Sequence, residues 1–315
     1  MGFYLAWIID TVAFLWYITD IHKRKGQSVL KRVFALLLAI ALLLAGCAGT
    51  QSAEETTTAG GETMLPKDKE YSILFIGNSY TFYNDMPTVY FQAMAKACGY
   101  NLTVATITKG AYTLEKFANP ADPYGTLVKN ALSGATKYDY VIIQEQSVRP
   151  AINAPAFYDG VRALVEKIRG IGAQPVLYAT WGRKTGSDTL EKYNFTNEEM
   201  TYKLAAAYDA IAKELEIPVV HVGLAFFDLY TNSALELYNA DKSHPSAAGS
   251  YIAAMSLFCQ IFGYAPEEIP IAGPGTDDET KMIQAAVKKI TAEAPVIPEN
   301  YKTDSAGVTQ TTPPA

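Results

Sequence analysis

The sequence predicts an α/β protein of three layers, in which a central parallel five-stranded sheet lies between two layers of helices. Two observations lead to this prediction. Short runs rich in Val, Ile and Leu alternate with longer segments of helical periodicity along most of the chain. The short runs are apolar almost throughout, which is typical of strands that are covered by helices on both faces.

Five segments have the strand pattern, and each is bounded by turn residues. In such a sheet the carboxyl ends of the strands lie at one edge, where α/β proteins bind their ligands. The residues that follow each strand are therefore the first candidates for a functional site. The expected strands are Ser72–Ile76, Leu102–Ile107, Tyr140–Ile143, Pro175–Ala179 and Pro218–Val222.

The helical segments repeat apolar residues at intervals of three and four. The clearest case is the segment 156–171, whose apolar residues fall on one helical face. One further helix is expected on the outside of the body, near the end of the chain. The expected helices are Pro87–Cys98, Thr126–Leu132, Ala156–Ile171, Glu198–Leu215, Ser246–Phe262 and, on the outside, Asp278–Glu293.

Composition is that of a protein with one sizeable core. The 315 residues are 49% hydrophobic and 18% charged, with a formal net charge of -6. Five of the Lys and Arg residues lie within the first 46 positions, so the rest of the chain is more acidic still. An acidic body without a basic cluster argues against nucleic acid as a partner.

The segment "KRVFALLLAIALLLAGC", from Lys31 to Cys47, has the pattern of a secretory signal. Its basic start is followed by an apolar run from Val33 to Ala45, which is shorter than the roughly 20 residues that span a bilayer. The ending Leu-Ala-Gly-Cys resembles a bacterial lipobox. This resemblance implies that Cys47 is lipidated and anchors an exported protein to the bacterial cell membrane, on its surface or periplasmic face. The alternative is an ordinary signal peptide.

The predicted organisation has four parts. Residues 1–46 form an export region, and residues 47–70, rich in Thr, Glu, Gly and Ala, form a flexible tether. The folded domain spans residues 71–295, and residues 296–315 form a disordered tail. The apolar stretch before Lys31 is either an extra membrane segment or lies upstream of a translation start near Val29 or Leu30, and the second interpretation is favoured.

A serine, a histidine and an aspartate are the candidate catalytic residues. Ser79 follows the first strand, and Asp241 and His244 lie three residues apart in a polar turn before a late helix. A serine hydroxyl becomes a nucleophile when a base accepts its proton, and the base needs a partner that fixes its tautomer. The body has one other histidine, His221, which interrupts an apolar strand and is expected to be structural.

The stretches "FIGNSYT" and "DKSHPS" resemble the SGNH, or GDSL-type, hydrolases, a family of flavodoxin-like esterases. The resemblance implies that Ser79 is the nucleophile, His244 the base and Asp241 the residue that orients it. It also places the family's second-block glycine at Gly110 and its third-block Asn at Gln146. The sequence departs from the family at "GNS", where the family has Gly-Asp-Ser, and at "QEQS", which stands for Gly-x-Asn-Asp.

The expected oxyanion hole and substrate contacts follow from these positions. The oxyanion donors would be the backbone N–H groups of Ser79 and Gly110 and the side-chain amide of Gln146. Aromatic residues beside the site could form a wall for sugar stacking or belong to the core. Arg183 could bind an anionic or polar substituent or be an exposed charge. The candidate substrate-binding residues are Asn78, Tyr80, Tyr112, Trp181 and Arg183.

The sequence contains no metal-ligand spacing, no phosphate-binding loop and no Gly-x-Ser-x-Gly motif, so neither a metal nor a cofactor is expected. Cys98 and Cys259 fall in apolar helical patterns and are expected to be buried free thiols. The function predicted is that of a surface-anchored monomeric serine esterase that removes short acyl groups, acetyl above all, from carbohydrates. The alternatives are a lipase or lysophospholipase, an acyltransferase with the same triad, and a non-catalytic glycan-binding module.

Overall fold

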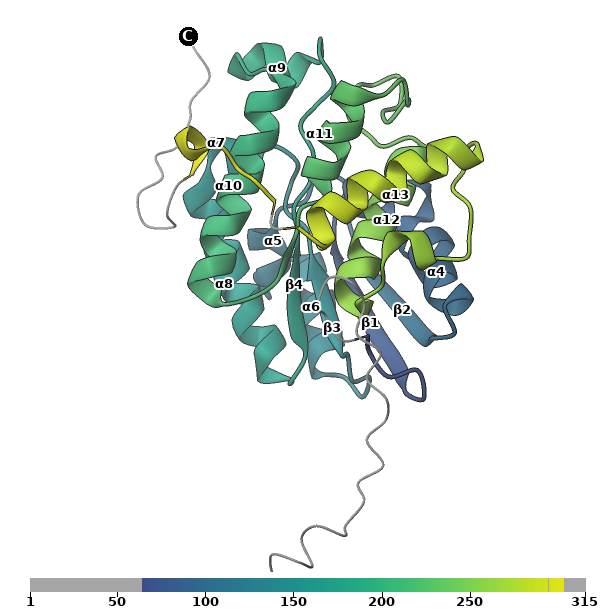
Figure 1. Cartoon of the computed structure of the whole chain (residues 1–315). Coiled ribbons are helices and arrows are strands. Elements are labelled where there is room, and N and C mark those ends of the chain that lie inside the picture. The colour runs from purple at the N-terminus through teal and green to yellow at the C-terminus, as the bar shows by residue number, and fades with distance from the viewer. Residues whose placement is uncertain (1–63, 294, 303–315) are drawn as a thin grey trace, which may run out of the picture. The chain divides into compact units, whose positions relative to one another are not determined.

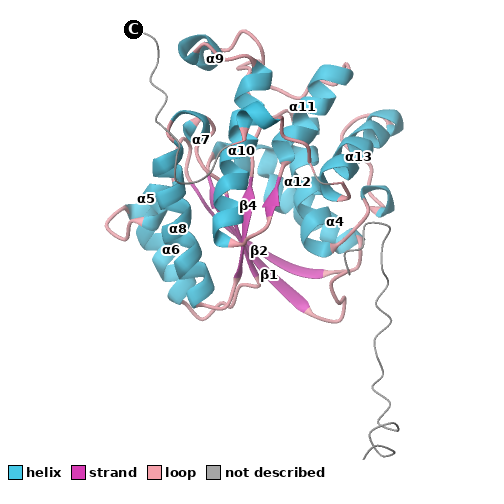
Figure 2. Cartoon of the chain, turned by 60° about the vertical axis from the view of Figure 1, so that its left-hand side comes forward, coloured by secondary structure: helices cyan, strands magenta, loops and turns pink. Residues whose placement is uncertain are grey.

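A five-stranded sheet, parallel throughout, forms the centre of the protein, with helices on both sides (Figures 1 and 2). The structure, a computed structural model, describes residues 64–293 and 295–302. The strand order is β2-β1-β3-β4-β5, so the chain builds the sheet outward in both directions from β1. The strands are β1 (Glu70–Gly77), β2 (Asn101–Thr108), β3 (Tyr140–Ile143), β4 (Gln174–Tyr178) and β5 (Val219–Val220).

Alternate residues of each strand enter two separate cores. In β1, Ile73 and Phe75 pack into one core, while Leu74 and Ile76 pack into the other, and all four are fully buried. Successive side chains of a strand point to opposite faces, so a strand that is apolar at every position needs a helical layer on each face. The predicted three-layer fold is confirmed.

The helices divide between the two faces of the sheet, as the view in Figure 2 shows. The first core is covered by a π-helical segment (Met86–Phe91), α4 (Gln92–Ala97), α11 (Val222–Asn232), α12 (Ala247–Phe262) and α13 (Asp277–Thr291). The second core is covered by α5 (Leu114–Ala118), α6 (Pro123–Ser133), α8 (Ala154–Gly170) and α10 (Asn197–Leu215). The shorter elements are α3 (Ser79–Phe82), α7 (Arg149–Ile152), α9 (Asp188–Tyr193) and 3-10 turns at Tyr83–Asp85, Pro266–Glu268 and Glu299–Tyr301.

The main differences from the sequence-based elements lie after the strands. The fifth strand is only two residues long, because α11 begins at Val222, inside the segment that was expected to be strand. The first six residues of α11, 222–227, have no polar side chain, so they continue the apolar run of the strand and no change of pattern marks where the helix begins. Four further short helices, α3, α5, α7 and α9, were also not expected. They are too short for periodicity to reveal them.

Both predicted boundaries of the folded domain need correction. Leu65, within the predicted tether, donates its N–H to the Phe262 carbonyl and packs against the first core. In the predicted tail, Ile297 is 4% exposed and packs with α10, and Tyr301 lies against Tyr202. The body therefore includes residues on both sides of 71–295. The export region, Cys47, the tether up to residue 63 and the tail from residue 303 lie outside the described residues.

Two further observations concern the described part of the chain. Cys98 and Cys259 are buried and free, as expected, and burial raises the pKa of the Cys98 thiol to about 11. None of the helices within residues 64–293 and 295–302 has the length and apolar character needed to cross a membrane.

Candidate active site

Ser79 lies two residues after the end of β1, at the carboxyl edge of the sheet, and β1 stands between β2 and β3 in the strand order. Gly77, the last residue of β1, leaves no room for a side chain. A Cβ there would lie 2.3 Å from the Thr81 Oγ1 and 2.8 Å from the Gln144 Oε1. Gly77 thus lets the chain turn tightly from the strand into α3, with Ser79 as the first residue of that helix.

Asn78 connects the three loops that meet beside Ser79. Its Oδ1 accepts the Tyr80 N–H, and its Nδ2 donates to the carbonyls of Tyr112 and Glu145, at 3.2 and 3.1 Å. These partners follow β2 and β3, so one side chain fixes the loops of three neighbouring strands. Asn78 is 2% exposed, and these bonds occupy both ends of its amide. The side chain thus positions the Ser79 turn, and because Asn78 also lines the cavity beside Ser79, its contact with substrate stays a prediction.

Asp241 and His244 lie in a closed turn that returns the chain toward α12. The Asp241 Oδ1 accepts the N–H groups of Ser243 and His244, at 3.0 and 2.9 Å. The Asn239 N–H donates to the His244 carbonyl, which closes the turn from the other side. Lys242 takes a left-handed conformation, with φ 60°, at the tightest point. The turn holds the carboxylate and the imidazole side by side.

A continuous chain of hydrogen bonds joins the three predicted catalytic residues. The Asp241 Oδ2 lies 2.5 Å from the His244 Nδ1, and the His244 Nε2 lies 2.8 Å from the Ser79 Oγ. Partial burial alone would raise the pKa of Asp241. The hydrogen bonds from the His244 ring and from two backbone N–H groups outweigh that effect and hold this pKa below its usual value. The carboxylate is thus kept charged beside the ring.

The Ser79 hydroxyl and the His244 ring open into a cavity of about 440 Å³. Its wall comes from the loops after β1, β2, β3 and β4 and from the Asp241–His244 turn. No titratable carboxylate lines it. The lining residues are Asn78, Ser79, Tyr80, Phe82, Tyr83, Gly110, Ala111, Gln146, Ser147, Arg183, Ser243 and His244.

The three predicted oxyanion donors all lie in this wall. Within the described residues, the backbone N–H groups of Ser79 and Gly110 have no hydrogen-bond acceptor. A Cβ built on Gly110 would meet no atom within 4 Å, so the space beside it is open. Packing within the protein therefore does not require glycine at this position. The lack of a side chain leaves room for a ligand to approach the Gly110 N–H.

Gln146 is oriented by its own loop. Its Oε1 accepts the N–H groups of Val148 and Arg149, both at 3.1 Å, which leaves the Nε2 amide as the free end. That amide lies 3.4 Å from the Ser147 Oγ, another residue of the cavity wall. Since Gln146 lines the cavity and its Oε1 is occupied, the Nε2 amide is the end available to a ligand, and its role as an oxyanion donor stays a prediction.

Two buried side chains lie behind this loop. The Gln144 Oε1 accepts the Asn78 N–H and the Thr81 hydroxyl, both at 2.9 Å. Glu145 accepts the N–H groups of Gln146 and Leu114, and burial raises the pKa of its carboxyl to about 7. Sequence reasoning gave neither residue a role, although both belong to the quoted "QEQS" block.

Of the predicted aromatic wall, Trp181 and Tyr80 belong to the core. Trp181 is 1% exposed and is stacked between Tyr80 and Phe226, with centroids 4.5 and 4.4 Å away. Its indole N–H donates to the Ser243 carbonyl, so it supports the catalytic turn from beneath. Tyr80 borders the cavity at 2% exposure, and its hydroxyl lies 3.1 Å from the Ser243 Oγ. Trp181 has both faces covered and does not line the cavity, so its predicted sugar contact is wrong, whereas Tyr80 lines the cavity and its contact with substrate stays a prediction.

Tyr112 lies outside the cavity wall, and Arg183 lies in it. The Tyr112 hydroxyl donates to the Asp122 carboxylate at 3.0 Å, and its ring packs on Phe117. This ring is committed to the second helical layer, so its predicted substrate contact is also wrong. Arg183 donates to the Ser147 Oγ at 2.8 Å and remains a candidate for binding substrate.

Two residues hold His244 in ways that sequence reasoning did not predict. The Tyr83 ring is stacked on the imidazole, with centroids 4.5 Å apart and planes at 14°. The Asn84 Nδ2 contacts the carbonyls of Pro245 and Ser246, at 3.0 and 3.1 Å, and so connects the serine loop to the histidine turn. Asn84 has a φ of 54°. Only its place directly after the aromatic stretch could have drawn attention to it.

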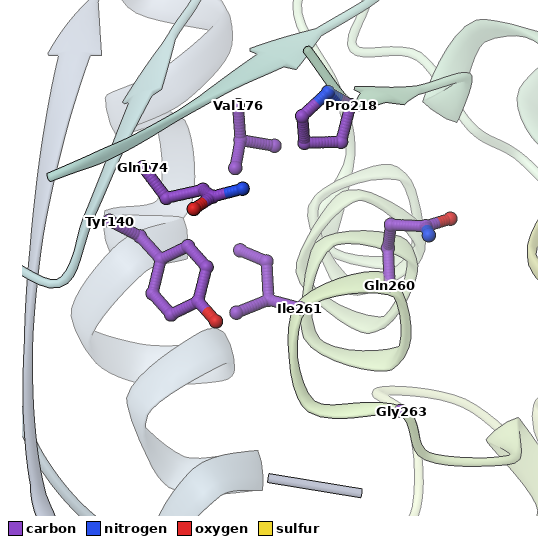
Figure 3. A pocket seen from close by; sticks show the side chains of 7 residues that line it. All are labelled: Tyr140, Gln174, Val176, Pro218, Gln260, Ile261 and Gly263. Atoms are coloured by element: carbon purple, nitrogen blue, oxygen red, sulfur yellow. The ribbon is translucent and has the colours of Figure 1, made fainter. Parts of the chain in front are cut away.

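A second cavity, of about 330 Å³, lies at the opposite edge of the sheet. Figure 3 shows Tyr140, Gln174 and Pro218, which stand at the amino ends of β3, β4 and β5, around this space. Its lining contains no histidine, carboxylate or basic side chain. Across the described residues, no group of three His, Cys, Asp or Glu side chains could hold a metal ion. The site at the carboxyl edge, where a carboxylate, an imidazole and a hydroxyl are joined by hydrogen bonds, is the candidate for chemistry.

Comparison with solved structures identifies similar proteins. A "putative SGNH hydrolase" from Slackia heliotrinireducens is 33% identical, with a TM-score of 0.54, and the match covers 60% of this chain and 98% of that one. A DUF4886 family protein from Bacteroides uniformis is 19% identical, with a TM-score of 0.61, over 70% of this chain and 93% of that one, and this likeness bears on the fold alone. No family model matches the sequence, and no curated protein does.

Proposed function

The chain belongs to the SGNH hydrolase family, and we propose that it is a serine esterase that removes short acyl groups through Ser79, His244 and Asp241. One observation carries the proposal. The carboxylate, the imidazole and the hydroxyl are joined by hydrogen bonds of 2.5 and 2.8 Å, and they open into a cavity with unoccupied N–H donors. This is the arrangement that acyl transfer to serine requires.

In the first half of the reaction, the His244 Nε2 accepts the proton of the Ser79 hydroxyl while Oγ attacks the ester carbonyl carbon. The negative Asp241 keeps the Nδ1–H in place and stabilises the imidazolium that forms. When the bond to the alcohol breaks, His244 returns the proton to the leaving oxygen. The acyl group is then held on Ser79 as an ester.

The carbonyl oxygen becomes negative in the tetrahedral intermediate. The N–H groups of Ser79 and Gly110 and the Gln146 amide are placed to donate to it. Loss of one such donor costs about 3 kcal/mol of transition-state stabilisation in serine hydrolases. In the second half of the reaction, His244 accepts a proton from water, the hydroxide adds to the acyl carbon, and Ser79 leaves with its proton restored.

The support for a short acyl group is the limited size of the cavity, about 440 Å³. Its surface is mainly apolar, and Phe82, Tyr83 and Ala111 are among its apolar side chains. Phe82 is 37% exposed at the rim, where a ring face can pack against a sugar. We therefore propose acetyl esters of carbohydrates as the substrate class, in preference to lipids.

We also propose that the protein is exported and anchored through lipid on Cys47. The support is the sequence pattern "LAGC" after an apolar run, followed by a polar segment that can serve as a tether. To test it, the full chain is expressed in a bacterium supplied with an alkyne-labelled fatty acid. We expect the membrane fraction to contain labelled protein that Cys47→Ser abolishes. Label that persists in this variant, or is absent from both, contradicts the anchor.

The esterase proposal is tested by kinetics on the full chain in detergent. The substrates are nitrophenyl acetate and nitrophenyl decanoate, and the variants are Ser79→Ala and His244→Ala. We expect turnover of the acetate ester that both variants lose by at least about 1,000-fold. Full activity in Ser79→Ala would exclude this site, and a preference for decanoate would favour the lipase. Release of acetate from acetylated glycans then tests the carbohydrate.

A further inference from the structure

Arg183 places a positive charge in the wall of the reaction cavity. Its side chain is held from two directions. The Nη2 donates to the Ser147 Oγ at 2.8 Å, and the guanidinium carbon lies 5.7 Å from the centroid of the Tyr80 ring. Tyr80 is in turn fixed by its stacking on Trp181. The guanidinium is therefore held at a defined place beside the nucleophile.

Among the described residues, the Arg183 guanidinium has no carboxylate as a counter-ion. Arg149 and Arg162 pair with carboxylates, and Arg169 donates to the backbone carbonyl of Leu215. Arg183 forms no ion pair with any residue in the described part of the chain. The only hydrogen-bond partner of its guanidinium there is a neutral hydroxyl. Its Nε is buried and has no hydrogen-bond acceptor. A partly buried guanidinium with most of its donors unused is ready to bind an anion.

The position of Ser147 connects this charge to the reacting ester. The Ser147 Oγ lies 2.8 Å from the Arg183 Nη2 and 3.4 Å from the Nε2 of Gln146, the proposed oxyanion donor. An anion on the guanidinium would thus lie only one hydroxyl group away from the carbonyl under attack. An anion at this distance can belong to the same small molecule as the ester.

We propose that Arg183 binds an anionic group of the substrate, so that the enzyme prefers esters carrying a carboxylate close to the scissile bond. This inference rests on the proposed esterase function. The charge could be part of the acyl group, as in a dicarboxylic half-ester, or of the alcohol, as in an acetylated acidic sugar. In both cases the planar guanidinium can donate two parallel hydrogen bonds to the carboxylate. The net charge of -6 would otherwise repel such a substrate.

Two pairs of esters test the proposal and distinguish the two sources of charge. For the alcohol side, 4-acetoxybenzoate is compared with its neutral methyl ester. For the acyl side, mono-nitrophenyl succinate is compared with nitrophenyl butyrate. Values of kcat/KM are measured for the full chain and for Arg183→Gln, Arg183→Lys and Lys184→Gln. Lys184 is the matched control, because it is adjacent, carries the same charge, pairs with Glu236 and does not line the cavity.

We expect Arg183→Gln to lower kcat/KM for the anionic member of one pair by about 10-fold or more relative to its neutral member, mainly through KM. For Arg183→Lys, the ratio of kcat/KM between the anionic and the neutral ester should lie between those of Arg183→Gln and the native chain. Lysine keeps the positive charge but cannot donate two parallel hydrogen bonds to a carboxylate. Lys184→Gln should leave the ratio unchanged. Added salt should reduce the preference of the native chain for the anionic ester and have less effect on Arg183→Gln.

Equal losses on charged and neutral esters in Arg183→Gln would overturn the proposal and assign the residue a structural role. An unchanged ratio in both pairs, or a shift of the same size in Lys184→Gln, would also overturn it. The proposed function fails in a different way, because Ser79→Ala would then hydrolyse all four esters as fast as the native chain.

Discussion

The described part of the chain contains two histidine–aspartate pairs with nearly the same N···O distance and different surroundings. The His244 Nδ1 lies 2.5 Å from Asp241, and the His221 Nε2 lies 2.6 Å from Asp209. The His244 side chain is 28% exposed and its second nitrogen contacts the Ser79 hydroxyl. The His221 side chain is 3% exposed, and its second nitrogen, Nδ1, is buried without a partner.

Each imidazole has a carboxylate beside it, but only the His244 ring also contacts a hydroxyl. What differs is the nitrogen that the carboxylate occupies and what the other nitrogen meets. Asp241 occupies Nδ1, so Nε2 projects outward to a hydroxyl in an open cavity. Asp209 occupies Nε2, so the remaining nitrogen faces the interior at the start of α11. We therefore expect the first pair to govern activity and the second to govern stability.

Substitution of the two histidines should give the largest contrast. We expect His244→Ala to lower kcat/KM by about 1,000-fold or more, because Ser79 loses its proton acceptor. We expect His221→Ala to lower the free energy of unfolding by about 1–3 kcal/mol through the lost charged hydrogen bond, with activity of the folded fraction retained. Ester hydrolysis and urea denaturation measure the two effects. Loss of activity in folded His221→Ala, with activity retained in His244→Ala, would contradict the different roles assigned to the two histidines.

The two aspartates provide a milder version of the same test. Asp241→Asn should lower kcat by about 100- to 10,000-fold, because an amide cannot stabilise the imidazolium and can favour the wrong tautomer. Asp209→Asn should change kcat by less than about 3-fold, since Asp209 has no contact with the cavity. Comparable losses of kcat in both variants would mean that the His221 pair takes part in the reaction.

Asn84 tests what keeps His244 in position. Asn84→Ala removes the hydrogen bonds to Pro245 and Ser246, and we expect kcat to fall by about 10-fold. Because Asn84 has a φ of 54°, Ala there is also strained, and Asn84→Gly is the control that removes the bonds without the strain. If Asn84→Gly has native kcat, the link between the two loops does not position the base.

The acid dependence of stability should show the smallest effect. The lowered pKa of Asp241 means that the folded protein keeps this group charged at a pH where the unfolded chain is protonated. Its contribution is therefore present above about pH 4 and is lost as the pH falls through the lowered pKa. Since the carboxylate is half exposed, we expect only a few tenths of a kcal/mol.

Denaturation of the native chain and of Asp241→Asn at pH 6 and at pH 3 measures this contribution. The difference between the two proteins should narrow at the lower pH. A difference that widens on acidification would contradict the charged state assigned to Asp241.

The fold was predictable because alternation of apolar runs and helical periods is a local pattern. The hydrogen-bonded set of Ser79, Asp241 and His244 was predictable because these residues stand at strand and helix ends, where polar residues have few structural explanations. Exposure of aromatic side chains was not predictable. Trp181 and Phe82 are both near the nucleophile, and only packing decides that the first is 1% and the second 37% exposed.

The supporting contacts of the site depend on long-range geometry in the same way. Asn84 meets the histidine turn across more than 160 positions of sequence, through a left-handed backbone that no local pattern indicates. Gln146 was identifiable by its position after β3, but the orientation of its amide depends on the N–H groups of the following turn. The sequence was therefore enough to identify Gln146 as a candidate, but the structure was needed to see how its side chain is oriented.

The central claim is that His244, and not His221, activates Ser79, and covalent labelling tests it most directly. The full chain, His244→Ala and His221→Ala are treated with a fluorophosphonate, which reacts with activated serines, and the adducts are located by mass spectrometry. We predict a single adduct on Ser79 in the native chain. The same adduct should form at a similar rate in His221→Ala and at least about 100-fold more slowly in His244→Ala. Equal labelling rates in the two variants, or an adduct on another serine, would contradict it.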